Sequence, residues 1–204
     1  MIIEKHFEVL KKIFWRDGIK CLTMENICHC LGIAKKTLYK DFANKKELVN
    51  ALFYEDFKRF RRELLHKIND RSDAIQQLCV FFDLLSKRQN SFSYATLGDL
   101  RKYYPELQSE INGLENRLIM EIATLILKQG IAEKNFREDI VPERIVSIFS
   151  FHYMSGIILR SNQIHQNQFS FSDTGLLDFH FRSISTPAGL ELWNSRMANF
   201  VSRI

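Results

Sequence analysis

The sequence predicts an all-α protein of about nine or ten helices, and three observations support that fold class. Apolar residues make up 46% of the 204 residues, which is enough for a sizeable core. They recur at helical spacings of three and four residues, not in the alternation typical of strands. Only three prolines and eight glycines interrupt the chain, so long helices are expected.

The first 42 residues predict three short helices. The first ends near Gly18, and its inner face consists of Ile3, Phe7, Leu10 and Phe14. In the second, Thr23 can cap the start and Gly32 can adopt the left-handed conformation that ends a helix. The third spans Ala34–Phe42 with Ala34, Leu38 and Phe42 inward. At about 100° per residue its outer face presents Lys36, Tyr39 and Lys40, and Lys35 and Thr37 lie on the flanks.

This segment resembles the DNA-binding part of TetR-family transcriptional regulators. The positions that match the family pattern at its spacing are Thr23, Ile27, Gly32, Thr37, Leu38, Tyr39, Phe42, Lys45 and Leu48. Two positions depart: Ala34 replaces the usual Ser that caps the recognition helix, and Asp41 replaces the usual Tyr or His. The resemblance covers about the first quarter of the chain.

The resemblance implies a homodimeric regulator, usually a repressor, that binds a palindromic operator and is released by a small ligand. Residues 1–47 would form the helix-turn-helix domain, and residues 48–204 the helical ligand-binding and dimerisation domain. Lys36 and Lys40 would reach base edges in the major groove. Phosphate contacts would come from Thr37, Tyr39 and Lys45. Thr23 and Lys35 are the other candidate DNA-binding residues.

A long helix from Lys45 to about Lys67 is predicted, because Asn44 and Glu47 form a capping box at its start. A lysine in the first turn opposes the helix dipole, so Lys45 indicates an anion such as a DNA phosphate, with a merely solvated lysine as the alternative. Asp41 is expected to turn towards Lys45 or towards the N–H groups that open this helix.

The positive charge of the chain is concentrated in its first third. Residues 1–68 hold 15 Lys and Arg against 9 Asp and Glu, whereas residues 69–204 hold 14 against 15. This asymmetry favours a polyanionic partner for the N-terminal part alone, although solvated basic faces are common.

The rest of the chain predicts further helices and a polar loop. Ser72 would cap the next helix, and Gly130 would stop the helix that begins at Pro105. The helices are expected over residues 73–89, 93–104, 105–129, 142–162, 173–183 and 188–202, with the loop at 163–172.

Two apolar surfaces predict the homodimer interface. Ile145–Leu159 is apolar on nearly every face, which is typical of a helix that is central or lies between subunits. One face of the last helix consists of Leu190, Trp193, Met197 and Val201. Together they predict an intersubunit helix bundle built from the C-terminal helices.

A mostly apolar ligand of unknown identity is expected among the aromatic residues of the helical domain. The candidate contacts are Phe57, Phe60, Phe82, Tyr103, Phe149, His152 and Tyr153. Each aromatic residue is individually more typical of the core, and His152 is either the ligand's polar anchor or a satisfied core histidine. The alternative function is a DNA-bound scaffold that recruits a protein partner without any small ligand.

Other classes of function have little support. No nucleophile–base pair, metal-spaced cluster or phosphate loop occurs, so neither an enzyme nor a cofactor is expected. Cys28 and Cys30 lie two residues apart on a helix and point to different sides, which is poor metal geometry. The N-terminus lacks signal-peptide features, and the run Ile145–Leu159 is too short to span a membrane. A reducing cytoplasm is therefore the expected location.

Overall fold

The computed structural model describes residues 2–161 and 174–201, and within them the chain is all-α as predicted. The described part contains ten helices and no strand beyond one isolated bridge between Phe136 and Ser185. In order they are α1 (Ile2–Asp17), α2 (Met24–Leu31), α3 (Lys35–Asp41), α4 (Lys45–Asn69), α5 (Ala74–Ser91), α6 (Tyr94–Tyr103), α7 (Pro105–Ala132), α8 (Pro142–Ser161), α9 (Thr174–Ile184) and α10 (Pro187–Val201).

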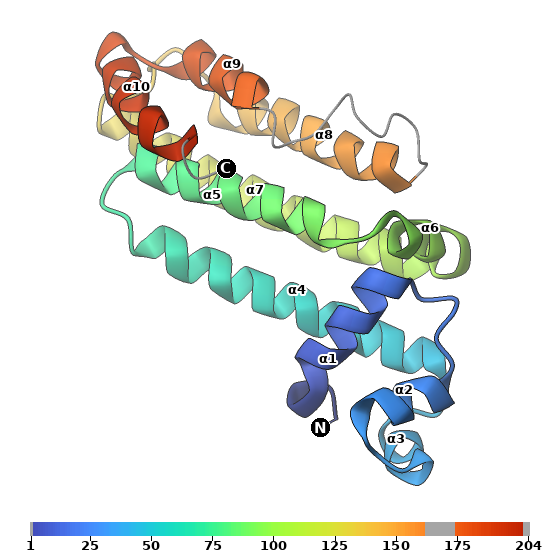
Figure 1. Ribbon diagram of the computed structural model, residues 1–204. Coiled ribbons are helices and arrows are strands. Elements are labelled where there is room, and N and C mark those ends of the chain that lie inside the picture. Colours follow the sequence, from blue (N-terminus) through green and yellow to red (C-terminus); the bar gives the residue numbers. More distant parts are fainter. Residues whose placement is uncertain (1, 162–173, 202–204) are drawn as a thin grey trace.

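The three N-terminal helices lie at one end of the molecule, and a stack of long helices forms the rest (Figure 1). Helix α4 packs against α1 and also against α5 and α7, so it joins the two parts. Helix α7 packs along α8, while α6 contacts α1, α7 and α8. The short helix α6 therefore lies where the N-terminal part meets the helical stack. None of the described helices combines the length and apolarity needed to cross a membrane.

Local capping signals fix the helix-turn-helix. The Thr23 side chain accepts a hydrogen bond from the Asn26 N–H at 3.1 Å. The Asn26 side chain in turn accepts a hydrogen bond from the Thr23 N–H. Gly32 has φ 64°, the left-handed conformation that glycine adopts most easily, and ends α2. Leu38 and Phe42 are buried as predicted, but Ala34 is exposed and forms the N-cap of α3 without a side-chain bond. The inner face of α3 is therefore narrower than its sequence spacing predicts.

Two predicted helix boundaries are wrong. Asp73, not Ser72, caps α5, because its Oδ1 accepts from the Gln76 N–H at 3.0 Å. Helix α7 continues through Gly130 to Ala132. At Gly130 a Cβ atom would lie 2.1 Å from the Phe136 ring, so this glycine serves close packing inside the helix instead of ending it. The loop predicted at 163–172 lies outside the described residues.

Trp193 belongs to the interior of the chain, which corrects its assignment to a subunit interface. Its side chain is 1% exposed and stacks on Phe181 with ring centroids 3.8 Å apart. Its Nε1 donates to Asp178 at 2.9 Å. Leu190 is half-buried, and the side chains of Met197 and Val201 lie outside the described residues. The face of α10 that carries Trp193 therefore holds α9 and α10 together within one chain.

Candidate DNA-binding surface and ligand cavity

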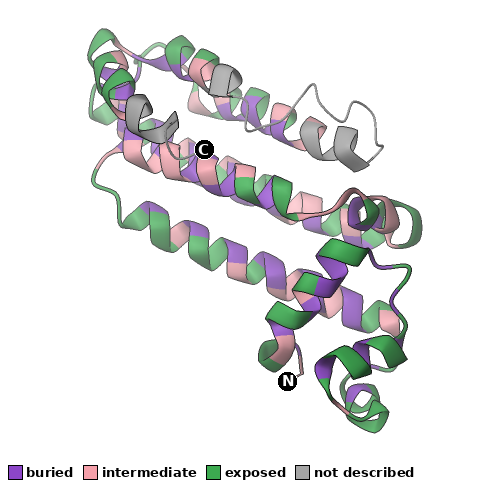
Figure 2. Ribbon diagram, in the orientation of Figure 1, coloured by how far each residue is buried: buried purple, intermediate pink, exposed green. Residues whose placement is uncertain are grey.

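Helix α3 presents nearly all of its side chains to solvent (Figure 2). Leu38 is its only buried residue and fixes the helix to the domain core. Tyr39 is 48% exposed although it is a large aromatic residue. The structure brings the predicted recognition residues together on this outward surface, which consists of Lys35, Lys36, Thr37, Tyr39 and Lys40.

Two of the predicted contact residues are engaged inside the domain. Lys35 Nζ forms an exposed ion pair with Glu25 Oε1 of α2, and the neighbouring carboxylate raises the pKa of the Lys35 ammonium. The Thr23 hydroxyl caps α2 and also bonds Asn26 Oδ1. Lys36 and Lys40 are exposed, and among the described residues no ion pair involves them. They are the cations of α3 that can reach an anion without first leaving a partner.

Lys45 lies at the start of α4 and is half-buried against the loop between α1 and α2. Its Nζ donates to the Lys20 carbonyl oxygen at 3.4 Å. Burial lowers the pKa of Lys45, which the nearby Cys21 and Asp99 partly oppose. The side chain is thus held against the turn between α1 and α2, with its ammonium close to a backbone acceptor.

The sequence predicted that Asp41 turns towards Lys45 or towards the N–H groups that open α4, and among the described residues the structure shows neither contact. Asp41 Oδ2 accepts the N–H of Ile2 at 3.0 Å and so satisfies an orphan donor in the first turn of α1. The positive end of the α1 dipole favours a carboxylate at this position. Asp41 therefore joins the end of the recognition helix to the beginning of the domain.

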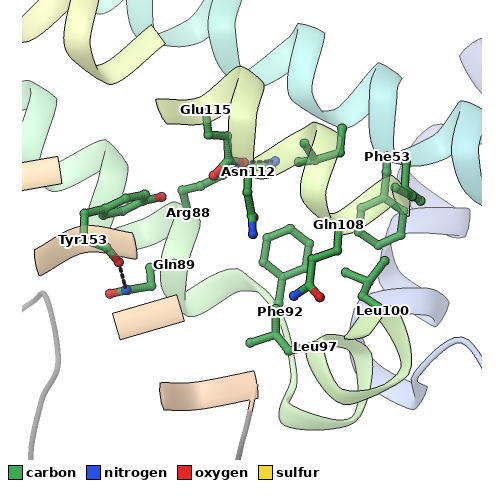
Figure 3. Close-up of a pocket in the computed structure, with 12 residues that line it drawn as sticks. Phe53, Arg88, Gln89, Phe92, Leu97, Leu100, Gln108, Asn112, Glu115 and Tyr153 are labelled. Atoms are coloured by element: carbon green, nitrogen blue, oxygen red, sulfur yellow. Dashed lines mark hydrogen bonds and ion pairs between the residues drawn. The ribbon is translucent and has the colours of Figure 1, made fainter. Parts of the chain in front are cut away.

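An apolar cavity lies among α4, α5, α6, α7 and α8 (Figure 3). It holds about 490 Å³ of space that no protein atom fills, part of which opens to solvent. The lining residues are Phe53, Arg88, Gln89, Phe92, Leu97, Leu100, Leu107, Gln108, Ile111, Asn112, Glu115 and Tyr153.

A buried chain of ion pairs runs behind this cavity from α1 to α7. Lys11 Nζ lies 2.9 Å from Asp56 Oδ1, and Asp56 Oδ2 accepts from Arg88 Nη1. Arg88 then donates through Nε at 2.9 Å and Nη2 at 2.7 Å to Glu115 Oε1. Burial disfavours the Arg88 charge, but Glu115 and Asp56 outweigh it and raise the pKa of the guanidinium.

The same cavity is next to the contacts that join α6 to the DNA-binding part. Ser93 N–H donates to the Trp15 carbonyl at 3.1 Å, and Thr96 Oγ1 donates to the Phe14 carbonyl at 2.8 Å. Asp99 Oδ2 accepts the Lys20 N–H at 2.6 Å. A shift of α6 would therefore act on the end of α1 and on the turn that precedes α2.

The seven predicted ligand contacts do not gather in one place. Tyr153 lines the apolar cavity, whereas Phe82 and Phe149 line a second one beside α9, with about 380 Å³ unfilled. Phe60 lines a polar cavity between α1, α4 and α5, with about 780 Å³ unfilled. Phe57 is buried in the core. The remaining two residues lie apart from these cavities: Tyr103 is 42% exposed, and His152 Nδ1 is 3.1 Å from His180 Nε2.

Sequence reasoning missed the buried charges at and behind the apolar cavity, although a signal for them was present. Asp56, Arg88 and Glu115 each occupy a position within an apolar helical stripe. Arg88, for example, follows Phe81 and Leu84 at spacings of three and four. A charged residue that continues an inward face indicates a buried pair. Within the described residues, no three His, Cys, Asp or Glu side chains are grouped to hold a metal ion.

Comparison with known proteins gives one family and several similar folds. Residues 8–52 match the family of bacterial regulatory proteins called tetR. The chain is similar to a transcriptional regulator from Cytophaga hutchinsonii, with a TM-score of 0.68 and 19% identity over 91% of this chain and 99% of that one. No curated protein matches the chain significantly.

In two other similar structures the protein is named together with a ligand. FadR from Bacillus subtilis in complex with stearoyl-CoA has a TM-score of 0.57 and 18% identity over 88% of this chain and 95% of that one. A gamma-butyrolactone receptor described as ArpA-like has a TM-score of 0.61 and 16% identity over 98% and 96%. The segment of residues 8–52 is thus that of the tetR family of bacterial regulatory proteins, and nearly the whole chain shares its fold with solved structures of transcriptional regulators.

Proposed function

We propose that this regulator is a repressor that binds a palindromic operator as a homodimer and is released by a small, mostly apolar ligand. The observation that carries the DNA-binding part is the outward surface of α3, where the exposed side chains of Lys36, Thr37, Tyr39 and Lys40 surround one buried anchor, Leu38. Residues 1–47 would act as the DNA-binding domain and residues 48–204 as the ligand and dimer domain.

The operator can be found directly, by sequencing the genomic DNA fragments that the purified protein retains. The expected result is a two-fold symmetric site whose half-sites are about one helical turn apart. Lys45→Ala should then weaken binding to operator and random DNA alike, and should reduce the salt dependence by about one counterion, because a phosphate contact is lost. An unchanged salt slope would mean that Lys45 stays on the Lys20 carbonyl and does not reach DNA.

Release by a ligand is supported by the position of the apolar cavity beside α6. Leu97 and Leu100 of α6 line the cavity, and Thr96 and Asp99 of the same helix hold α1 and the following turn. A ligand that displaces α6 would change the placement of α2 and α3. Similar structures bind ligands such as stearoyl-CoA, in the case of FadR from Bacillus subtilis, which favours ligand control here over a ligand-free scaffold.

A second copy of the chain is proposed to cover the exposed apolar residues of α8 and α9. Phe151 is 70% exposed, Phe179 is 66% exposed and Ile148 is 52% exposed. Exposed aromatic residues of this kind are typical of a protein interface. Phe151→Asp should produce monomers in sedimentation, whereas the control Val9→Asp, at an exposed position of α1, should not. A Phe151→Asp variant that remains dimeric would place the interface elsewhere.

A further inference from the structure

Tyr103, the last residue of α6, lies at the surface with two lysines around its ring. Lys20 Nζ is 6.0 Å from the centroid of this ring, and Lys102 Nζ is 5.4 Å from it. Lys20 belongs to the loop between α1 and α2, whereas Lys102 belongs to α6. Two ammonium groups from distant parts of the chain are thus gathered at one exposed ring. We call Lys20, Lys102 and Tyr103 the α6 patch.

The lysines of the α6 patch have no carboxylate partner within the described part of the chain. Lys20 and Lys102 are exposed, and no ion pair between described residues involves either of them. The two nearby carboxylates are engaged elsewhere. Asp99 Oδ2 accepts the backbone N–H of Lys20 at 2.6 Å, and Glu106 Oε2 is 3.5 Å from Lys46 Nζ. Exposed cations gathered in this way favour a polyanionic partner.

The α6 patch adjoins the surface that is proposed to bind DNA. Lys45 Nζ, a proposed phosphate contact, donates to the Lys20 carbonyl oxygen at 3.4 Å. The next residue, Lys46, pairs with Glu106 at the start of α7, so the end of α6 lies beside the start of α4. The loop from α1 to α2 runs between α6 and the helix-turn-helix (Figure 1). A duplex bound at Lys45 would bring further phosphates close to Lys20, because phosphates recur about every 3.4 Å of helix axis on each strand.

A purely structural role does not account for the whole patch. Lys102 in the last turn of α6 suits the negative end of that helix dipole. Lys20 lies in a loop, and its bonds to Asp99 and Lys45 use its backbone and not its side chain. An aromatic ring attracts ammonium groups through its quadrupole, so Tyr103 holds both side chains in place despite their mutual repulsion. Tyr103 was expected to contact an apolar ligand, and the structure places it in a cationic surface instead.

We propose that the α6 patch is a second DNA-binding surface, where Lys20 and Lys102 contact phosphates next to the one that Lys45 binds. The proposal rests on the proposed DNA-binding function and extends it from the helix-turn-helix to α6. Phosphate contacts orient a protein on the duplex without reading its sequence, so the patch adds affinity and leaves base preference unchanged. Helix α6 also lines the apolar cavity, and it would then contact DNA directly in addition to its bonds with α1.

Salt titrations of the full-length protein on operator and random-sequence duplexes test the patch. Lys20→Ala/Lys102→Ala removes two proposed phosphate contacts. Each lost contact should make the ratio of the affinities at about 50 and 200 mM salt about 3.5-fold smaller, which gives about 12-fold for the double variant. Lys58→Ala/Arg61→Ala is the matched control, because both residues are exposed and lie about 20 Å or more along α4 from Lys45. Equal changes in the two double variants would overturn the proposal.

Neutral methylphosphonate groups, placed one at a time along the operator, locate the contacts. Lys20→Ala/Lys102→Ala should become insensitive to neutralisation at the phosphates next to the one that no longer matters in Lys45→Ala. Base preference, measured with a library of operator variants, should remain that of the original protein. If the double variant and the original protein respond to the same set of phosphates, the α6 patch does not contact DNA.

The proposed function and the α6 patch fail in different ways. If Lys45→Ala reduces the salt dependence and Lys20→Ala/Lys102→Ala does not, DNA binding through the helix-turn-helix stands and only the patch is wrong. If the original protein binds no duplex in a salt-dependent way, the DNA-binding function is wrong, and the role of the patch with it.

Discussion

The charges of the recognition helix and those behind the apolar cavity have opposite surroundings. Lys36 and Lys40 on α3 are exposed to solvent. The Arg88 side chain is 4% exposed, and its carboxylate partners, Asp56 and Glu115, are 1% and 6% exposed. Water stabilises the first group whatever its partners are, whereas the second depends on its own ion pairs. Substitutions of the exposed lysines of α3 should therefore change DNA binding alone, whereas substitutions at Arg88 should lower the free energy of unfolding.

The largest expected effect is that of Arg88→Met. Removing the guanidinium leaves Asp56 and Glu115 buried without their shared partner, so the free energy of unfolding should fall by about 3–5 kcal/mol. Denaturant titration measures this change. Lys87→Met is the matched control, because its ion pair with Asp83 lies at the surface and is worth about 1 kcal/mol or less. If the free energy of unfolding falls by the same small amount in both variants, the contrast between the two regions does not hold.

Lys36→Ala should change recognition without changing stability. Losing a base contact should alter preference at one position in each half-site by about 1–3 kcal/mol. The free energy of unfolding should remain within about 0.5 kcal/mol of the original, as for most surface substitutions. Binding to a library of operator variants measures the first quantity, and denaturant titration the second. A uniform loss across all sequences would reassign Lys36 to a phosphate.

Asp41→Asn sharpens the comparison, because this exposed carboxylate also accepts a hydrogen bond from the N–H of Ile2 in α1. Loss of its charge beside the α1 N-terminus should lower the free energy of unfolding by about 0.3–1 kcal/mol. Affinity for operator and random DNA should rise together at low salt, because a repulsion towards phosphate is removed. Asp17→Asn is the control for charge alone, since Asp17 pairs with Arg16 at the end of α1. A rise for random DNA only would indicate that Asp41 also positions α3.

The smallest effect is expected at His180, whose half-buried side chain is intermediate between the exposed lysines of α3 and the buried Arg88. Burial and the neighbouring His152 lower its pKa from the ordinary 6.5. The folded protein therefore resists protonation, and stability that is present above pH 6.5 should decline as the pH falls below it. His180→Gln should reduce the slope by less than about 1.4 kcal/mol per pH unit, the limit for one proton.

The parts of the structure that follow local rules could be predicted from sequence. Thr23, Gly32 and Asn44 fix helix ends through bonds within a few residues, so the helix-turn-helix and its exposed lysines were predicted correctly. The cavity could not be predicted in this way, since its walls come from five helices between Phe53 and Tyr153. Aromatic density indicated the core in general but not the void. The charged positions inside the apolar stripes of α4, α5 and α7 were the more informative signal.

The two tryptophans provide optical reporters for the two ends of the molecule. Trp15 stacks with Phe53 and Phe92 at 4.6 and 5.0 Å, next to the cavity. Its Nε1 is buried and, among the described residues, has no hydrogen-bond partner. Trp193 instead donates to Asp178 in the α9–α10 corner. With Trp193 replaced by Phe, the remaining emission would follow the contact between the cavity and α1 in real time, without any attached dye.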